Sequence, residues 1–234
     1  PKAFPNWSNV PVGKLLHEQV KCPIFIENNA SAATIGERWY GAGKNIPNFL
    51  YTFFGAGLGG GLILNGSLYE GPNKNSGELG YFPYLDTKSP LSNSIQPHIG
   101  EHFNLINLYK WLEEDHVKVQ RPEDLTPLFL DKNPRFMEWL NLAKRILLPV
   151  FLSVEYLLDI DIIILGGRLP KPIIEDLSKD IPRLLDEIRI DVKNTRVKFE
   201  VGTAGVDAAA LGAATLPMFQ LFAAQTDLLI KQSQ

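Results

Sequence analysis

The hydrophobic positions along the chain alternate between strand-like and helix-like spacing. Apolar runs rich in the aromatic and β-branched residues that strands prefer lie at 21–27, 49–54, 62–64, 161–165 and 197–201. Segments with helical spacing lie at 12–20, 104–114, 134–158, 172–188 and 207–222. A further helix is expected to run through 38–40, with Asn29 or Ser31 as its N-cap and Gly41 at its end. Strands that alternate with helices predict an α/β fold with one mixed sheet.

A glycine-rich stretch at 52–66, TFFGAGLGGGLILNG, allows two interpretations. Gly55, Gly57 and Gly60 match the G-x-G-x-x-G dinucleotide fingerprint, but that motif needs a helix directly after the glycines. Here a strand at 62–64 follows, and the Asn-Gly pair that ends the stretch is a strong hairpin signal. The stretch therefore predicts a strand, a turn and a second strand, and the backbone N–H groups of such a turn can still hold a phosphate.

Composition and charge narrow the class of protein. The chain has 234 residues, of which 45% are hydrophobic, so a large buried core is expected and disorder is not. A formal net charge of −3 argues against a nucleic-acid-binding module within these residues. Cys22 is the single cysteine, which excludes an internal disulfide and a cysteine-rich zinc site. Without a long apolar run or a signal-peptide pattern, the sequence predicts a soluble, cytoplasmic protein.

Five motifs occur in order and together resemble the ROK family of bacterial sugar kinases and sugar-responsive transcriptional repressors. They are ENNASAATIGE at 27–37, GAGLGGGLILNGSLYEG at 55–71, GELGY at 77–81, IIILGG at 162–167 and GVDAAALGAA at 205–214. The resemblance covers nearly the whole chain. It implies the actin-like ATPase fold, which is related to that of ribonuclease H.

The resemblance also implies a division of the chain. Residues 1–45 correspond to the end of the family's N-terminal lobe, including its sugar-binding motif, and 46–234 correspond to the C-terminal lobe. Family members begin with an Asp-x-Gly-Gly-Thr-like phosphate loop, and nothing similar precedes Glu27. The winged helix-turn-helix of repressor members is likewise not found in these residues.

The first motif indicates binding without catalysis. Family kinases have E-N-D-x-N, in which the Asn binds the sugar and the Asp is the general base for phosphoryl transfer. Here Asn28 matches the sugar-binding Asn, whereas Asn29 stands where the base should be. An amide cannot accept the proton, although it can hydrogen-bond the same hydroxyl. The alternative is that both asparagines only cap the following helix.

The glycine turn resembles the family's second phosphate loop, G-T-G-x-G-G-G. Gly55, Gly57 and Gly59 keep the glycines, but Ala56 replaces the Thr whose hydroxyl approaches the nucleotide phosphates. The alternative is a hairpin that binds nothing.

A second pair of glycines follows a fully apolar run at 161–165, which is typical of a buried parallel strand. Gly166 and Gly167 resemble the family's adenosine-side glycines, at the strand end where α/β sheets place ligands. The alternative is a plain strand-to-helix turn.

The GELGY motif resembles the family's G-E-I-G-H. Glu78 matches a Glu that hydrogen-bonds sugar hydroxyls, and Glu101 is a weaker candidate for the family's last sugar-binding Glu. Tyr81 replaces a His that touches the sugar and binds a structural zinc, so the ring is either a stacking platform or a steric plug. Because 83–100 contains no cysteine, the family's zinc site is predicted to be absent.

One rival metal motif lies at 98–102, where His98, Glu101 and His102 read H-x-x-E-H. This inverted zincin pattern needs a helix that presents both histidines on one face and a third ligand downstream. Pro97 and Gly100 weaken such a helix, so the motif is not favoured.

The sequence therefore predicts a ROK-type sugar-binding domain, most consistent with the effector part of a transcriptional regulator and catalytically inactive. The predicted ligand is a hexose or amino sugar, ATP and Mg²⁺ are expected only if kinase activity survives, and DNA would be bound only by a domain outside these residues. A homo-oligomer is expected, and the aromatic residues at 129–151 serve either its interface or the core. The alternatives are an ATP-dependent sugar kinase and an interaction domain without a ligand.

Overall fold

The computed structural model describes residues 10–83, 98–190 and 196–222, with a five-stranded mixed sheet at its centre. The sheet order is β3-β2-β1-β4-β5. The strands are β1 (Phe49–Phe54), β2 (Leu58–Leu64), β3 (Ser67–Tyr69), β4 (Ile162–Gly167) and β5 (Lys198–Val201). β1, β4 and β5 are parallel, whereas β2 and β3 run antiparallel to their neighbours. The predicted α/β class and mixed sheet are confirmed.

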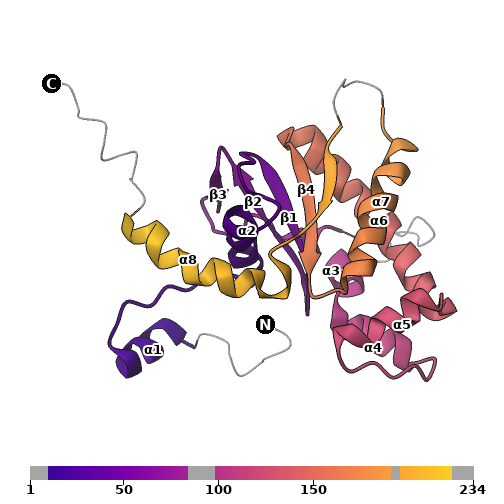
Figure 1. The fold of residues 1–234 in the computed structure, drawn as a ribbon, viewed down its shortest axis with the longest axis horizontal. Coiled ribbons are helices and arrows are strands. Elements are labelled where there is room, and N and C mark those ends of the chain that lie inside the picture. The colour runs from indigo at the N-terminus through magenta and orange to yellow at the C-terminus, as the bar shows by residue number, and fades with distance from the viewer. Residues whose placement is uncertain (1–9, 84–97, 191–195, 223–234) are drawn as a thin grey trace, which may run out of the picture.

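Helices cover both faces of this sheet, with α6 and α7 on one side and α2 and α8 on the other (Figure 1). The α-helices are α1 (Val12–Val20), α2 (Asn29–Tyr40), α3 (Ile99–His102), α4 (Leu105–Glu113), α5 (Leu125–Leu130), α6 (Pro134–Leu158), α7 (Lys171–Asp186) and α8 (Ala208–Phe222). Short 3₁₀ turns are η2 (Leu79–Tyr81), η3 (Pro122–Asp124) and η4 (Gly205–Asp207). In the part of the chain that is described, no helix is long and apolar enough to cross a membrane.

Alternation along the central strand produces two separate cores. In β1, Leu50 and Phe54 belong to the core beneath α6 and α7. Phe49, Tyr51 and Phe53 belong to the core beneath α2 and α8. Successive side chains of a strand point to opposite faces, so a strand that is apolar throughout is buried on both. The continuous apolar run at 49–54 is therefore explained by its central position in the sheet.

The core beneath α6 and α7 consists of large side chains. Phe136, Trp139 and Phe151 are all buried there, which supports the core alternative for the aromatic segment at 129–151. Phe151 meets Phe199 of β5 edge to face, with ring centroids 5.3 Å apart. Aromatic pairs prefer this arrangement over a parallel stack.

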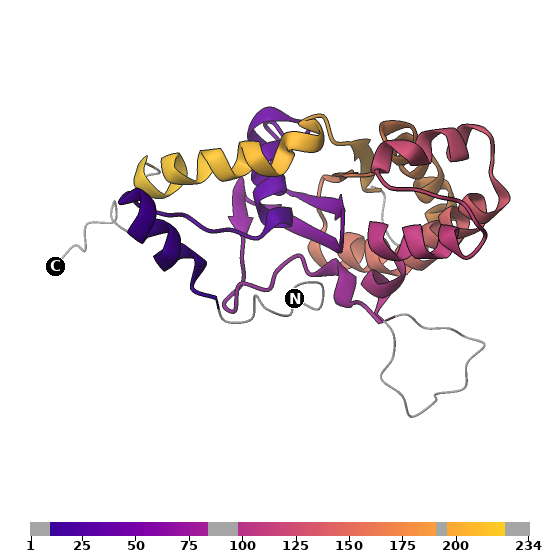
Figure 2. The ribbon, with the colours of Figure 1, turned by 90° about the horizontal axis from the view of Figure 1, so that it is seen from below.

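Helices α2 and α8 lie directly against each other over the other face (Figures 1 and 2). A Cβ added to Gly212 would stand 1.7 Å from the carbonyl oxygen of Ala32, and one added to Gly36 would stand 2.0 Å from that of Ala208. Only glycine permits backbones to approach so closely. Gly212 and Gly36 therefore allow the two helices to pack closely.

Two sequence expectations about strands were wrong. Residues 21–27 are irregular, because they pair with none of the strands in the described sheet and an extended segment needs a partner for its backbone groups. The second strand begins at Leu58 rather than at Leu62, so Gly59, Gly60 and Gly61 lie inside it. Glycines at these positions let Ala30, Leu79 and Thr34 pack directly on the strand.

Candidate functional site

A cleft of about 790 Å³ lies where the amino end of α2, the turn between β1 and β2, and the turns η2 and α3 meet. Its lining residues include all five predicted sugar-binding residues, namely Asn28, Asn29, Glu78, Tyr81 and Glu101. These residues come from three distant parts of the chain. The structure thus brings Asn28 and Glu78 into one cavity, as the sugar-binding interpretation requires.

Asn28 occupies the N-cap of α2, where its Oδ1 accepts the backbone N–H of Ala30 at 2.8 Å. Asn28 therefore caps the helix and Asn29 does not, whereas the sequence predicted Asn29 or Ser31 as the cap. Capping uses the amide oxygen and leaves two N–H donors on the same side chain. Asn29 is the first helical residue, and both asparagines are exposed in the cleft.

Glu78 and Tyr81 lie one turn apart in η2. Glu78 is the residue before the turn, and its carbonyl oxygen accepts the backbone N–H of Tyr81 at 3.2 Å. Both residues line the cleft.

His98 and Glu101 have a similar relation at the start of α3. The backbone N–H of Glu101 donates to the carbonyl oxygen of His98 at 2.9 Å, and both residues line the cleft. The ring of His98 meets that of Tyr81 edge to face, with centroids 5.5 Å apart and an interplanar angle of 76°. Each of the two turns thus supplies one ring and one carboxylate.

Glycine contacts hold these two turns together. A Cβ on Gly100 would lie 2.8 Å from the Cα of Gly80, and one on Gly80 would lie 2.5 Å from the carbonyl oxygen of Leu58. Pro83 and His98 form an antiparallel bridge, and the N–H of Ile99 donates to Phe82 at 2.9 Å. Backbone contacts therefore fix the position of α3 against η2.

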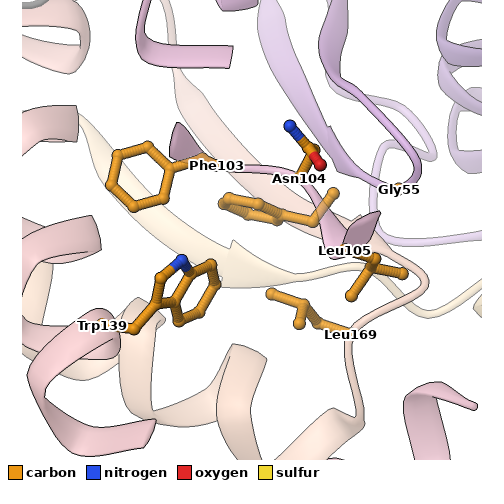
Figure 3. A pocket seen from close by; sticks show the side chains of 7 residues that line it. Gly55, Phe103, Asn104, Leu105, Trp139 and Leu169 are labelled. Carbon is orange, nitrogen blue, oxygen red and sulfur yellow. The ribbon is translucent and has the colours of Figure 1, made fainter. Parts of the chain in front are cut away.

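The glycine turn is divided between two environments. Ala56, Gly57 and Gly59 line the cleft, and a Cβ on Gly57 would meet nothing within 4 Å. Gly55 lines a different cavity of about 10 Å³, on which the side chains of Phe103, Leu105, Trp139 and Leu169 converge (Figure 3). This second cavity is too small for more than one water molecule.

The second glycine pair is adjacent to this turn. Gly166 and Gly167 end β4 in register with Phe53 and Phe54, so the carboxyl ends of two parallel strands lie side by side. Gly167 has φ +108°, and a Cβ there would lie 2.4 Å from the carbonyl oxygen of Phe54. The conformation requires glycine. Neither Gly166 nor Gly167 lines the cleft.

Glu37 connects α2 to the neighbourhood of η4. Its carboxylate is 1% exposed and accepts the backbone N–H groups of Ala42 at 2.8 Å, Thr203 at 3.1 Å and Ala204 at 3.0 Å. Burial, and then the negative charge of Glu37, raises the pKa of Tyr51 well above its ordinary value. The bonds from Thr203 and Ala204 tie α2, which carries Asn28 at its start, to the segment after β5.

The family's zinc does not fit this chain. Thiolate ligands are lacking, since the single cysteine, Cys22, lies outside the cleft. Within the described ranges, no three His, Cys, Asp or Glu side chains are grouped so as to hold a metal ion. The H-x-x-E-H alternative also fails there, because His98 precedes a helix of only four residues. Most of the segment 83–100 lies outside the described residues.

Sequence reasoning missed Lys74, Ser76, Phe53 and His98 as residues that line the cleft. Lys74 and Ser76 directly precede the GELGY motif, and this proximity was the available signal. His98 was considered only as a metal ligand. Its position beside Tyr81 depends on the contacts between η2 and α3, which no local pattern encodes.

Comparison with known proteins supports the resemblance. A family model described as "ROK family" matches residues 1–93. The matched residues include the first three of the five motifs.

Two curated relatives illustrate the range of this family. Glucokinase from Halalkalibacterium halodurans is 39% identical over 80 residues, which are 34% of this chain and 24% of that protein. Xylose repressor from Bacillus spizizenii is 40% identical over 85 residues, which are 36% of this chain and 22% of that protein. The match spans about a quarter of the length of these relatives. Similarity thus extends to both a kinase and a repressor.

The fold is shared over a longer range. A crystal structure of a ROK family glucokinase from Streptomyces griseus, in complex with glucose and AMPPNP, matches with a TM-score of 0.75 and 20% identity. The match covers 90% of this chain and 73% of that chain. At this identity the likeness establishes the fold, and the predicted actin-like ATPase fold is confirmed.

Proposed function

We propose that this chain is a ROK-type sugar-binding domain that acts as the effector part of a transcriptional regulator and does not phosphorylate its ligand. The observation that carries the proposal is the position of Asn29. It lies in a cleft with Asn28, Glu78 and Glu101, where a kinase would need a carboxylate. Amides and carboxylates suit neutral hydroxyl groups, so the cleft is suited to recognition without activation.

The proposal implies a sugar ligand, a DNA-binding domain and a second copy of the chain as partners. The ligand would be a hexose or amino sugar, and Asn28, Asn29, Glu78 and Glu101 would hydrogen-bond its hydroxyls. DNA would be bound by a domain outside these residues, and the regulator would act as a homo-oligomer. The similarity to a xylose repressor supports this assignment.

Sugar binding is tested by thermal unfolding of the full chain with glucose, xylose and N-acetylglucosamine. A sugar at a hundred times its dissociation constant should stabilise the fold by about 2.7 kcal/mol. Asn28→Ala and Glu78→Ala should remove that shift. If no sugar at millimolar concentration changes the unfolding midpoint, the chain is an interaction domain without a ligand and the proposal is wrong.

The second candidate is an ATP-dependent sugar kinase. It is favoured by the strand ends, where Gly57 lies in the turn after β1, Gly167 ends the neighbouring strand β4, and glycine backbones admit phosphate. A nucleotide would rest on backbone N–H groups there without the hydroxyl that Ala56 has lost. ATP with Mg²⁺ would supply the phosphoryl group, but Asn29 offers no acceptor for the proton of the sugar hydroxyl.

An assay of sugar-dependent ADP release separates the two candidates. Turnover is expected below roughly 0.1 per second for every sugar of the panel, which is slow for an enzyme. Asn29→Asp restores a carboxylate and should raise the rate if the rest of the kinase machinery persists. The control is Asn45→Asp, an exposed position outside the cleft. Turnover by the unaltered protein above that rate would exclude the non-catalytic assignment.

A further inference from the structure

The cleft has an aromatic side as well as a polar one. Tyr81 is 68% exposed although its ring belongs to the cleft lining, and its edge-to-face partner His98 lines the same cavity. A ring that plugged a pocket would be covered by the residues it touches. Tyr81 instead presents open aromatic surface to the space beside Glu78.

The position of this surface is well defined. Tyr81 is tied to Glu78 by one backbone hydrogen bond, and His98 is tied to Glu101 by another, at 3.2 and 2.9 Å. The Gly80–Gly100 contact and the Pro83–His98 bridge hold the two turns against each other. Backbone contacts therefore hold both residues next to the carboxylates.

The volume of the cleft also fits a ligand larger than one sugar ring. At about 790 Å³ it lies in the upper part of the range for small-molecule sites, roughly 300–1,000 Å³, where drug-sized ligands bind. A single pyranose ring fills only part of such a volume. Ligand sites combine a few placed polar groups with aromatic surface, and a rigid tyrosine ring provides contact area at a low cost in conformational entropy.

We infer that Tyr81 and His98 form a second subsite, which selects a sugar that carries another ring through a glycosidic bond. The added ring, either aryl or a second pyranose, stacks on Tyr81 while the sugar hydroxyls meet Asn28 and Glu78. This inference rests on the proposed sugar-binding function and adds the class of ligand. It assigns Tyr81 as a specificity-determining residue.

The test is titration calorimetry of the full chain with matched ligands. One set is glucose, phenyl β-D-glucoside and cellobiose, and the other is xylose, phenyl β-D-xyloside and xylobiose. At least one two-ring ligand should bind about ten-fold more tightly than its parent monosaccharide. The aryl and disaccharide arms show which kind of ring is preferred.

Variants of Tyr81 show whether the ring causes the preference. Tyr81→Ala should abolish the preference for the second ring while changing monosaccharide affinity less than about three-fold, and Tyr81→Phe should retain it. The matched control is Tyr69→Ala, because Tyr69 is also an exposed tyrosine but lies on β3 outside the cleft. It should leave every affinity unchanged.

Three results would overturn the inference. The first is a monosaccharide that binds as tightly as its two-ring derivatives, which refutes the second subsite but leaves sugar binding intact. The second is an equal loss of affinity for all ligands in Tyr81→Ala. The third is a gain in monosaccharide affinity in that variant, which would make Tyr81 a plug. If none of the six ligands binds, the proposed function itself fails.

Discussion

The two faces of the sheet are packed by different means. Beneath α6 and α7 the helices contribute large apolar side chains such as Trp139, Leu147 and Phe151. Beneath α2 and α8 they contribute Ala30 and Ala208, and the helix backbones touch at glycines. The first face is stabilised by buried apolar area, and the second by close backbone contact and the hydrogen bonds of Glu37.

This difference explains where the cleft lies. Large interdigitating side chains leave little free space, and the cavity of about 10 Å³ on that side shows how little remains. Small residues allow α2 to lie close to the sheet, so that its amino end with Asn28 reaches the cleft. The first core also holds Leu79 of η2 and Ile99 of α3, next to the cleft. Changes where α6 packs on β5 should therefore affect stability alone, and changes between α2 and α8 should affect binding as well.

The largest effect is expected from Phe151→Ala. The ring is fully buried against Phe199, and its removal should cost about 4 kcal/mol of unfolding free energy through lost burial and the cavity left behind. Chemical denaturation measures this loss. Leu157→Ala is the control on the same helix, because Leu157 is 81% exposed. Sugar affinity of the folded variant should remain unchanged, and a weakened affinity would contradict the separation of the two faces.

Gly212→Ala should cost about 3 kcal/mol, because the new Cβ would collide with the carbonyl oxygen of Ala32 and force α8 away from α2. Alanine otherwise favours helices, so a stabilised variant would refute the contact. Gly57→Ala is the control, because a Cβ there meets nothing within 4 Å, and its unfolding free energy should change by less than about 0.5 kcal/mol. Sugar affinity should fall in Gly212→Ala.

Glu37→Gln keeps the shape of the side chain but places an amide group where three backbone N–H groups need acceptors. We expect a loss of about 2 kcal/mol, measured by denaturation, together with weaker sugar binding because α2 is less firmly held. Glu18→Gln, at an exposed position on α1, is the control and should have no effect. Loss of stability with unchanged affinity would show that Glu37 does not position the cleft.

The smallest effect is expected from Lys144→Met, between α6 and α7. The Lys144 ammonium is 4% exposed and pairs with Asp176 and Asp180 at 2.6 Å, and its hydrogen bond holds the pKa of Asp180 below the ordinary value. Removal should cost about 1.5 kcal/mol at pH 7, less than for a fully buried pair, because both carboxylates are partly exposed.

The pH dependence of that cost has a definite sign. The pKa of Asp180 is lower in the folded state than in the unfolded state, where it is about 3.9. Its ion pair therefore stabilises the fold at pH values above the unfolded pKa, and this stabilisation is lost as the pH falls toward the folded pKa. Wild type should therefore lose more stability than Lys144→Met between pH 6 and pH 3. Lys179→Met, an exposed lysine on α7, is the control, and equal acid sensitivity of Lys144→Met and wild type would contradict the assignment.

Most of the fold could be predicted from local pattern. Apolar content and spacing predict the strands at 49–54 and 162–167 and the helix at 134–158. In these segments the local preference of the residues agrees with the element that they form in the folded chain. Residues 21–27 had the same strand-like content but lacked a partner in the described sheet. A strand is defined by its neighbour, so content alone misassigned it.

For the cleft, the sequence by itself determined the chemistry: which amides and carboxylates are present, that Asn29 stands in place of a base, and that 83–100 contains no cysteine for the family's zinc site. Only the tertiary structure decided that Asn28, Glu78 and Glu101 share a cavity and that the ring of Tyr81 faces His98. The reason is that side-chain chemistry is a property of single residues. Which residues lie close together depends instead on contacts between segments that are distant in the sequence, such as the contact of Gly80 with Gly100. No local sequence pattern predicts such a contact.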